Sequence, residues 1–389
     1  MFLRSHFKPA LLTTALCVAT LIALTGCTTP ATLGYYWQSV NGHLQLMRAA
    51  RPVPDWLADA QTPERLKERL ALSQRIRDFA ISDLKLPDNA SYRRYADLKR
   101  RAVVWNVVAA PPYSLTLKTW CFPVTGCVGY RGYFDEAAAK AEAAQVAHDE
   151  GMEVSVYGVP AYSTLGWMNW AGGDPLLNTF IGYPEGELAR LIFHELAHQV
   201  VYAQDDTVFN ESFATAVERL GSARWLITQA NPAARAEYKT FDAKRQQFRA
   251  LTQATRQRLS QIYDQKSVEA VAIGEKLAMK NAAMEKFKAD YAALKARFDD
   301  APERWAGYDG WVARANNATF GTLGAYDDLV DDFEALFQRE GQDWQRFYDA
   351  VRHLSTLPKD ERHKQLELQL NPPPGDATCL TSTFNAPTR

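Results

Sequence analysis

The residues best suited to chemistry are two histidines and a glutamate in the segment His194-Glu195-Leu196-Ala197-His198. On an α-helix, residues i and i+4 lie one above the other on the same face, so both imidazoles can face one metal ion. Glu195 lies beside them, where its carboxylate can take a proton from a water molecule. The alternative is a buried helix with two core histidines. The small number of histidines, 7 in 389 residues, disfavours a chance occurrence of this motif.

A second motif, Asn-Glu-Ser-Phe-Ala at residues 210–214, follows shortly downstream and offers Glu211 as a third ligand. Two histidines, one carboxylate and one open position are what a catalytic zinc ion requires. The two motifs therefore predict a zinc-dependent hydrolase in which Glu195 is the general base. The predicted ligands are His194, His198 and Glu211.

Together the two motifs resemble the paired zinc motifs of the gluzincin metallopeptidases, and residues 210–218 are most similar to the N-E-G-F-A-x-x-x-E pattern of the aminopeptidase branch. The resemblance implies that Glu211 is the third ligand and that Glu218, two helical turns on, supports a ligand histidine. Only residues 199–210 separate the two motifs, a shorter insert than is usual in that branch. A short loop can still return an antiparallel helix to the site. From about Tyr35 to the 350s, the chain is similar to a smaller family of bacterial lipoproteins named as aminopeptidases.

The resemblance leaves open whether the enzyme removes terminal residues or cuts internal bonds. The aminopeptidases hold the substrate amine with a glutamate in a G-x-M-E-N motif, whereas residues 166–170 here are Gly-Trp-Met-Asn-Trp. Asp174, Glu185 and Glu187 are alternative carboxylates that the sequence does not rank. An endopeptidase is one alternative function. A non-catalytic envelope lipoprotein with a structural metal, or with none, is another, but Glu195 argues against it because a closed structural site needs no general base.

Peptide hydrolysis passes through a tetrahedral oxyanion, which the metal and one further donor usually stabilise. In related aminopeptidases that donor is a tyrosine. Tyr326, which follows Gly321 and Gly324, is the first candidate here, and Tyr308 is the second. A core or surface tyrosine is the plainer interpretation of each. Residues 162–167 are expected to form an edge strand that pairs with an extended substrate, or else an ordinary strand or loop.

The first 26 residues have the pattern of a lipoprotein signal peptide. A basic start and an apolar stretch at residues 9–24 precede Leu24-Thr25-Gly26-Cys27, which resembles the bacterial lipobox. Cys27 is therefore expected to carry lipid chains that anchor the protein. Thr28 is not the aspartate associated with inner-membrane retention, so the expected place is the outer membrane, facing the periplasm. A plain secretory signal or an N-terminal membrane helix is the alternative.

Cysteine use agrees with export from the cell. Cys121 and Cys127 flank a turn-rich segment and could close a small disulfide loop, while two buried thiols are the alternative. The net charge of −1 indicates neither nucleic acid nor anionic lipid headgroups as a main partner. The expected partners are a peptide or protein substrate and the membrane that holds Cys27.

The hydrophobic patterns predict an α+β fold, with a small sheet before the zinc-motif helices and mostly helices after them. Helices are expected at residues 35–49, 63–84 and 135–150, and strands at 103–108, 115–122 and 154–157. Residues 233–298 contain no proline and alternate charged and apolar residues at helical spacing. One straight helix of that length would span about 100 Å, so a two-helix hairpin that turns near residues 264–268 is expected. A structural arm is favoured over a gate above the active site.

The chain is accordingly divided into five segments. Residues 1–26 are the signal peptide, 27–232 the N-terminal and zinc-motif region, and 233–300 the helical hairpin. Residues 301–370 are expected to form a helical region that completes the site. The tail at 371–389 is rich in proline, serine, threonine and glycine and is expected to be disordered.

Overall fold

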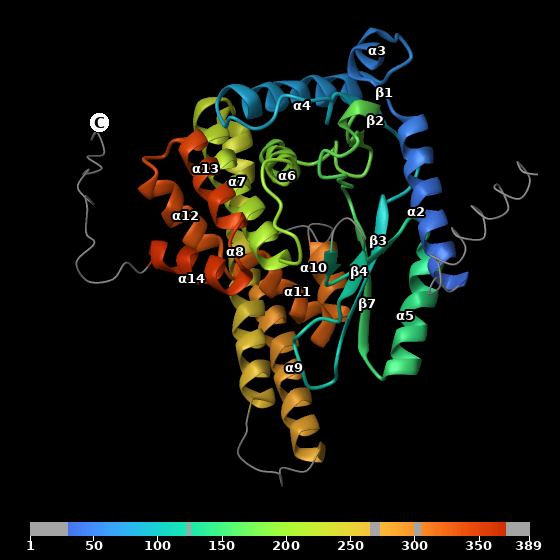
Figure 1. Ribbon diagram of the computed structural model, residues 1–389, viewed down its shortest axis with the longest axis vertical. Coiled ribbons are helices and arrows are strands. Elements are labelled where there is room, and N and C mark those ends of the chain that lie inside the picture. Colours follow the sequence, from blue (N-terminus) through green and yellow to red (C-terminus); the bar gives the residue numbers. More distant parts are fainter. Residues whose placement is uncertain (1–29, 123–125, 265–272, 299–304, 371–389) are drawn as a thin grey trace, which may run out of the picture. The chain divides into compact units, whose positions relative to one another are not determined.

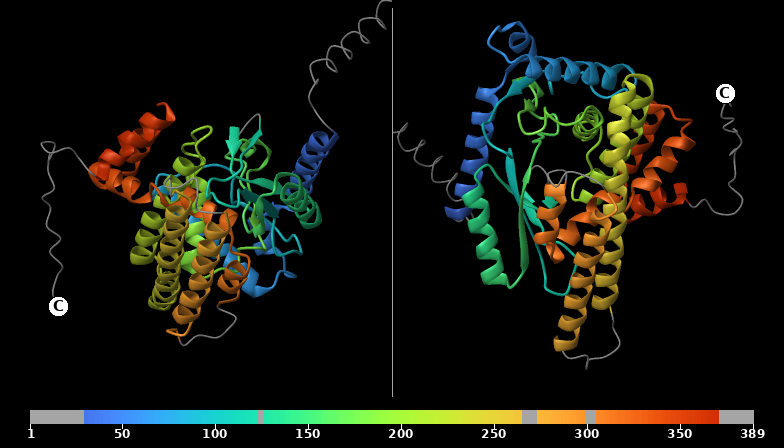
Figure 2. Two further views of the ribbon diagram at one scale, coloured as in Figure 1. Left: turned by 90° about the horizontal axis from the view of Figure 1, so that it is seen from below. Right: turned by 180° about the vertical axis from the view of Figure 1, so that it is seen from behind.

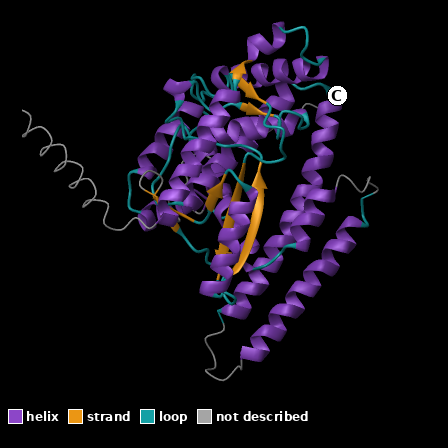
Figure 3. Cartoon of the chain, turned by 90° about the vertical axis from the view of Figure 1, so that its right-hand side faces the viewer, coloured by secondary structure: helices purple, strands orange, loops and turns teal. Residues whose placement is uncertain are grey.

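The computed structural model describes residues 30–122, 126–264, 273–298 and 305–370 (Figure 1). The chain divides into two compact units, Met1–Leu46 and Met47–Arg389. The described part of the first unit is helix α2 (Pro30–Ala49) up to Leu46. Helices predominate and the strands form small sheets, which confirms the predicted α+β class (Figure 3). No helix in the described ranges is long and apolar enough to span a bilayer.

The second unit contains an antiparallel sheet of three strands. Its central strand is β3 (Val104–Ala110), between β6 (Arg131–Tyr133) and β7 (Glu153–Val159). Helix α5 (Glu136–Glu150) connects β6 to β7 and packs on this sheet. The helix starts where Asp135 accepts the backbone N–H of Ala138, and it ends at Gly151, whose φ of 63° suits glycine. These elements match the expected strands at 103–108 and 154–157 and the expected helix at 135–150.

Two further small sheets flank the first. In one, β2 (Arg94–Ala96) pairs with β1 (Arg51–Pro52) and with β8 (Leu176–Leu177). In the other, β4 (Trp120–Phe122) and β5 (Gly126–Val128) form an antiparallel pair. Short helix α3 (Val53–Ala58) and α4 (Glu64–Ser82) lie between β1 and β2 along the chain, and α4 packs against the first site helix.

Helices α6 (Glu185–Ala197) and α7 (Thr207–Thr228) carry the two motifs and pack against each other. On α6, Leu188, Ile192 and Leu196 recur every four residues and are fully buried. Burying such a side chain contributes about 1.5–3 kcal/mol, so this face determines which side of α6 packs against the rest of the protein. The motif histidines consequently lie on the neighbouring face of α6.

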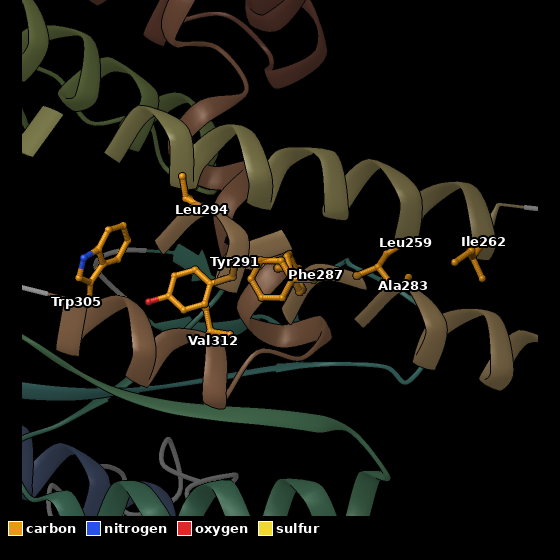
Figure 4. Close-up of a cluster of buried hydrophobic side chains, with 9 residues drawn as sticks. Leu259, Ile262, Ala283, Phe287, Tyr291, Leu294, Trp305 and Val312 are labelled. Atoms are coloured by element: carbon orange, nitrogen blue, oxygen red, sulfur yellow. The ribbon is translucent and has the colours of Figure 1, made fainter. Parts of the chain in front are cut away.

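The expected helical hairpin is present as α8 (Pro232–Tyr263) and α9 (Ile273–Lys295), which lie side by side in both views of Figure 2. Of its expected turn, Asp264 is described and the following residues lie outside the described part. Helices α10 (Ala306–Ala313) and α11 (Asn317–Asp327) follow. Figure 4 shows the apolar cluster that joins these elements, in which Leu259 of α8 and Phe287 of α9 are fully buried.

Three C-terminal helices complete the described chain: α12 (Val330–Arg339), α13 (Trp344–Ser355) and α14 (Lys359–Leu370). Helix α12 packs against both α7 and α14. The ring of Phe213 on α7 contacts Phe333 of α12 and Phe347 of α13, with centroids 5.6 and 5.8 Å apart. The C-terminal helices therefore support the helix that carries Glu211.

One expected strand is shorter than predicted, and a second segment is not a strand. Of residues 115–122, only Trp120–Phe122 form a strand, because Pro111 and Pro112 interrupt the preceding backbone and Lys118 donates its N–H to Ala109 outside a regular ladder. Residues 162–164 have no regular structure and residues 165–167 form a turn, so the loop alternative holds and the edge strand does not. Leu165 and Gly166 have φ values of 54° and 79°, and the N–H of Trp167 donates to the carbonyl of Thr164.

Candidate metal centre

His194 and His198 lie one turn apart at the end of α6, where His198 is the C-terminal cap. Their Nε2 atoms are 3.2 Å apart. Glu211, in the first turns of α7, places its Oε2 3.3 Å from Nε2 of His194 and 3.6 Å from Nε2 of His198. The structure thus brings together the three side chains that the sequence singled out as ligands.

The spacing of these three atoms suits a zinc ion. Zinc bonds to nitrogen and oxygen of about 2.0–2.1 Å in a tetrahedron separate neighbouring donors by about 3.3 Å. The three ligand atoms, which all lie within 4.8 Å of one another, match that spacing. Two facing ring nitrogens and a carboxylate oxygen are all electron-pair donors, so a single cation would satisfy them together. The donor set fits zinc in both chemistry and spacing.

Side-chain hydrogen bonds fix the short loop between the two helices. Asn210, the first residue of the second motif, accepts the N–H of Ala203 and donates to the carbonyl of the same residue, each at 2.7 Å. Asp206 caps α7 by accepting the N–H of Phe209 at 3.2 Å. The buried carboxylate of Asp206 also pairs with Arg362 and His363 of α14 at 2.6 and 2.9 Å. These contacts fix the start of α7 and therefore the place of Glu211.

A row of alternating charges extends from His194 to the helical hairpin. Nδ1 of His194 lies 3.1 Å from Oε2 of Glu218, and Glu218 makes an ion pair with Arg190. Arg190 lies 4.0 Å from Glu187, which pairs with Arg245 of α8 at 2.7 Å. We call these five residues the charge row. It includes Glu218 in the supporting position that the sequence resemblance implies.

These contacts determine which carboxylates are ionised. Burial opposes the charged form of Glu218, yet Arg190 and His194 lower its pKa to about 2. Burial is likewise outweighed at Glu211, whose pKa the two histidines lower. At Glu195 burial prevails and raises the pKa of the carboxyl, with a further contribution from Glu211. A carboxylate with a raised pKa is a better proton acceptor, which suits a general base.

Of the two tyrosine candidates from the sequence, the described structure places only the side chain of Tyr308. Tyr326 lies near the end of α11, and its side chain is outside the described part of the chain. The ring of Tyr308 packs on Phe248, with centroids 4.6 Å apart, in the cluster of the helical hairpin. After burial, the charge of Glu187 contributes most to raising the pKa of Tyr308. Tyr308 therefore lies near Glu187 and Arg190 of the charge row.

Three other tyrosines lie close enough to Glu211 for its charge to affect their pKa values. Burial raises the pKa of Tyr130, Tyr157 and Tyr202, and the negative charge of Glu211 adds to the effect at each of them. Tyr130 also feels the charge of Glu195. Tyr130 lies in the turn after β5, Tyr157 in β7 and Tyr202 in the loop after α6. Because three separate segments supply them, no spacing in the sequence marks them as a group.

The three carboxylates considered as amine anchors already have partners within the fold. Asp174 is buried, and it accepts the backbone N–H of Thr164 at 3.1 Å and the Thr164 hydroxyl at 2.8 Å. Burial raises the pKa of Asp174 to about 6. Glu185 accepts the indole N–H of Trp225 at 3.0 Å, and Glu187 belongs to the charge row. The amine-binding role is therefore not assigned to any of the three.

The cysteines at 121 and 127 form a disulfide across the paired strands β4 and β5. The backbone N–H of Cys127 donates to Asp205 at 2.6 Å, and Gly126, with a φ of 71°, lies against the same aspartate. The disulfide-linked pair is therefore tied to the loop between the two site helices. Cys27, the expected lipidation residue, lies outside the described residues.

Two histidines and a glutamate on packed helices, with a second carboxylate, Glu195, beside them, are a donor set typical of metal-dependent hydrolases. The chain belongs to the protein family whose model is described as "Putative aminopeptidase" and matches residues 34–366. The match includes every residue of the site. Comparisons with curated proteins and with solved structures found no match.

Proposed function

We propose that the protein is a zinc-dependent aminopeptidase of the gluzincin type. The observation that carries the proposal is the convergence of His194, His198 and Glu211 at zinc-like spacing, with Glu195 beside them. The family supports peptidase activity. An endopeptidase with the same machinery is the second candidate, because the described carboxylates near the site are already engaged and none stands out as an amine anchor.

Each residue of the site has a separate task. His194, His198 and Glu211 would hold zinc, which when bound supplies a Lewis acid that polarises the scissile carbonyl and acidifies water. Glu195 accepts the proton of the attacking water and passes it to the leaving amine. The carboxylate of Glu218 lies 3.1 Å from Nδ1 of His194, where it favours a proton on that nitrogen and so leaves the lone pair of Nε2 for the metal. Arg190 keeps Glu218 ionised.

The proposed place of action is the cell envelope. The lipobox-like segment ending in Cys27 supports a lipid anchor, and Thr28 supports the outer membrane with the enzyme facing the periplasm. The disulfide between Cys121 and Cys127 agrees with an oxidising compartment. The substrates are then peptides or proteins of that compartment.

The deciding experiment combines metal analysis with digestion of a peptide library by the purified protein. We expect one zinc per chain and release of N-terminal residues from peptides with free amines. Glu195→Gln should keep the metal and lose hydrolysis by roughly 10²–10⁴-fold, because it removes the base and no ligand. Cleavage of N-acetylated peptides at internal bonds would favour the endopeptidase. Bound zinc without hydrolysis by the unsubstituted protein would refute catalysis altogether.

A further inference from the structure

Helix α2 presents a stripe of large apolar side chains to solvent. Tyr36, Trp37, Val40 and Leu44 are exposed to 37, 73, 54 and 44%. Positions 36, 40 and 44 recur every four residues, and 37 lies beside them, so the four side chains share one side of the helix. Isolated exposed apolar residues are ordinary, whereas a contiguous patch marks a surface with a partner.

The composition around the stripe indicates what kind of partner it is. Helix α2 contains no aspartate or glutamate, and the first acidic residue of the whole chain is Asp55. Arg48 continues the series 36, 40, 44 by one turn. Tyrosine and tryptophan are the side chains enriched at the boundary between lipid and water, and arginine extends readily to phosphates. An apolar stripe with a basic end and no acidic residue suits a phospholipid surface.

The position of the stripe in the chain points to the same partner. Only Thr28 and Thr29 separate Cys27 from Pro30, where α2 begins. Consecutive Cα atoms are 3.8 Å apart, so acyl chains on Cys27 would hold the start of the helix within about 11 Å of the anchored residue. A helix tethered so closely meets the bilayer surface at high effective concentration.

We propose that α2 lies in the plane of the membrane, with Tyr36, Trp37, Val40 and Leu44 inserted among the lipids and Arg48 at the phosphates. The inference rests on the lipid anchor of the proposed function and adds a second contact to it. The acyl chains of Cys27 would hold the protein at the membrane, and the inserted stripe would fix how α2 lies against it. Interfacial helices of this kind bury their apolar face about 5–10 Å into the boundary between headgroups and acyl chains.

The test uses the full lipidated protein in vesicles of phosphatidylethanolamine and phosphatidylglycerol. Cys379 is first replaced by serine so that it cannot react with the label. A nitroxide is then attached at Val40→Cys or, as a matched control, at Gln45→Cys. Gln45 is also exposed on α2 but lies off the stripe. Depth is measured from the accessibility of the label to oxygen and to a water-soluble nickel complex. We expect the label at position 40 to lie roughly 5–10 Å below the phosphates and the label at 45 to face water.

Other outcomes would overturn the inference. Equal exposure of both labels to the nickel complex would show that α2 stands away from the bilayer. A label at position 40 that is shielded from both oxygen and nickel would show that a protein, such as a second copy, covers the stripe. An intact mass without acyl chains refutes the anchor separately. If the position-40 label of such non-acylated protein still reaches the lipid, α2 binds membranes unaided, and if it stays in water the inference fails as well.

Discussion

Glu211 and Glu218 lie two turns apart on the same face of α7, yet their atoms meet different sides of His194. Glu211 approaches Nε2, the atom that also faces His198, whereas Glu218 approaches Nδ1. A ligand contributes its own electron pair to the metal, while a carboxylate on the outer nitrogen fixes the ring and raises its basicity. The two glutamates would therefore differ in role even though both are largely buried and both contact the same histidine.

Replacing each glutamate by alanine should separate these roles. We expect Glu211→Ala to lose most of its zinc affinity, because one of three protein ligands is gone. Glu218→Ala should bind zinc about 10–100-fold more weakly than the unsubstituted protein, as is typical when an outer hydrogen-bond partner is removed. Competitive titration against a chromophoric chelator measures both variants. The reverse order of affinities would move the ligand role to Glu218.

Asp174 gives a prediction about pH. Its pKa is raised from an ordinary value of 3.8 to about 6, so the native state binds a proton that the unfolded chain has already released between these values. Stability therefore falls as pH rises from about 4 to 6. Above that window, this group causes no further change of stability with pH. A pKa difference of about 2 corresponds to about 3 kcal/mol.

We expect Asp174→Asn to remove most of that slope, which urea unfolding at a series of pH values would measure. Asp331→Asn is the control, because that side chain is 76% exposed. If both variants keep the same slope as the unsubstituted protein, the buried carboxyl of Asp174 is not its source.

At the scale of whole elements, the charge row joins three helices. His194, Arg190 and Glu187 belong to α6, Glu218 to α7, and Arg245 to α8 of the helical hairpin. Removing one partner of a buried ion pair leaves an uncompensated charge, which typically costs about 3–5 kcal/mol. The hairpin is therefore connected to the candidate metal centre through charged side chains as well as through its apolar cluster.

Arg190→Met and Arg245→Met test this connection at two distances from the ligands. We expect Arg190→Met to lower zinc affinity about 10–100-fold, because Glu218 loses the cation that keeps it ionised beside His194. Arg245→Met removes the outermost pair and should leave zinc affinity nearly unchanged, while urea unfolding reports the loss of stability in both. Equal losses of zinc affinity in the two variants would mean that the charge row acts only through stability.

The elements that the sequence predicted well are those with a local cause. The helices at 35–49, 63–84 and 135–150 and the hairpin have periodic apolar faces and recognisable ends, such as Asp135 and Gly151. The loop at 162–167 could not be predicted in this way, because it depends on Asp174, ten residues later, accepting hydrogen bonds from Thr164. An apolar, aromatic segment has strand propensity wherever it occurs, and the distant partner decides its structure.

The same distinction applies to the site. Two motifs placed His194, His198 and Glu211 together because helical spacing and a short loop are local properties. The tyrosines near Glu211 come from three parts of the chain, so only the packing of β7, the turn after β5 and the loop after α6 brings them together. The sequence does not indicate the charge row either, since Arg245 lies 58 residues from Glu187.

At the scale of the whole molecule, the C-terminal helices hold the start of α7. Arg362 is buried and donates to Asp206 and to the carbonyls of Leu354, Ser355 and Leu357. Its guanidinium also lies over the ring of Phe209, 5.1 Å from the centroid. One arginine thus joins the ends of α13 and α14 to the cap of the helix that carries Glu211.

Arg362→Met should therefore lower the free energy of unfolding by about 3–5 kcal/mol, because Asp206 and three carbonyls lose a buried partner. Arg352→Met is the matched control. That arginine is 47% exposed and pairs with Asp349 one turn away, so its loss should cost at most about 1 kcal/mol. Urea unfolding of both variants measures the difference. Similar values for the two would show that the contact between α14 and α7 contributes little.

The pairing of Asp206 with Arg362 also sets an order of events during synthesis. The two residues are 156 positions apart, so Asp206 lacks this partner until nearly all of the described chain has left the ribosome. Glu211 then resides on a helix whose first turn is incompletely held, although both histidines have long been made. A nascent or prematurely ended chain would consequently bind metal weakly. Such coupling would keep the proposed hydrolase inactive until its synthesis is nearly complete.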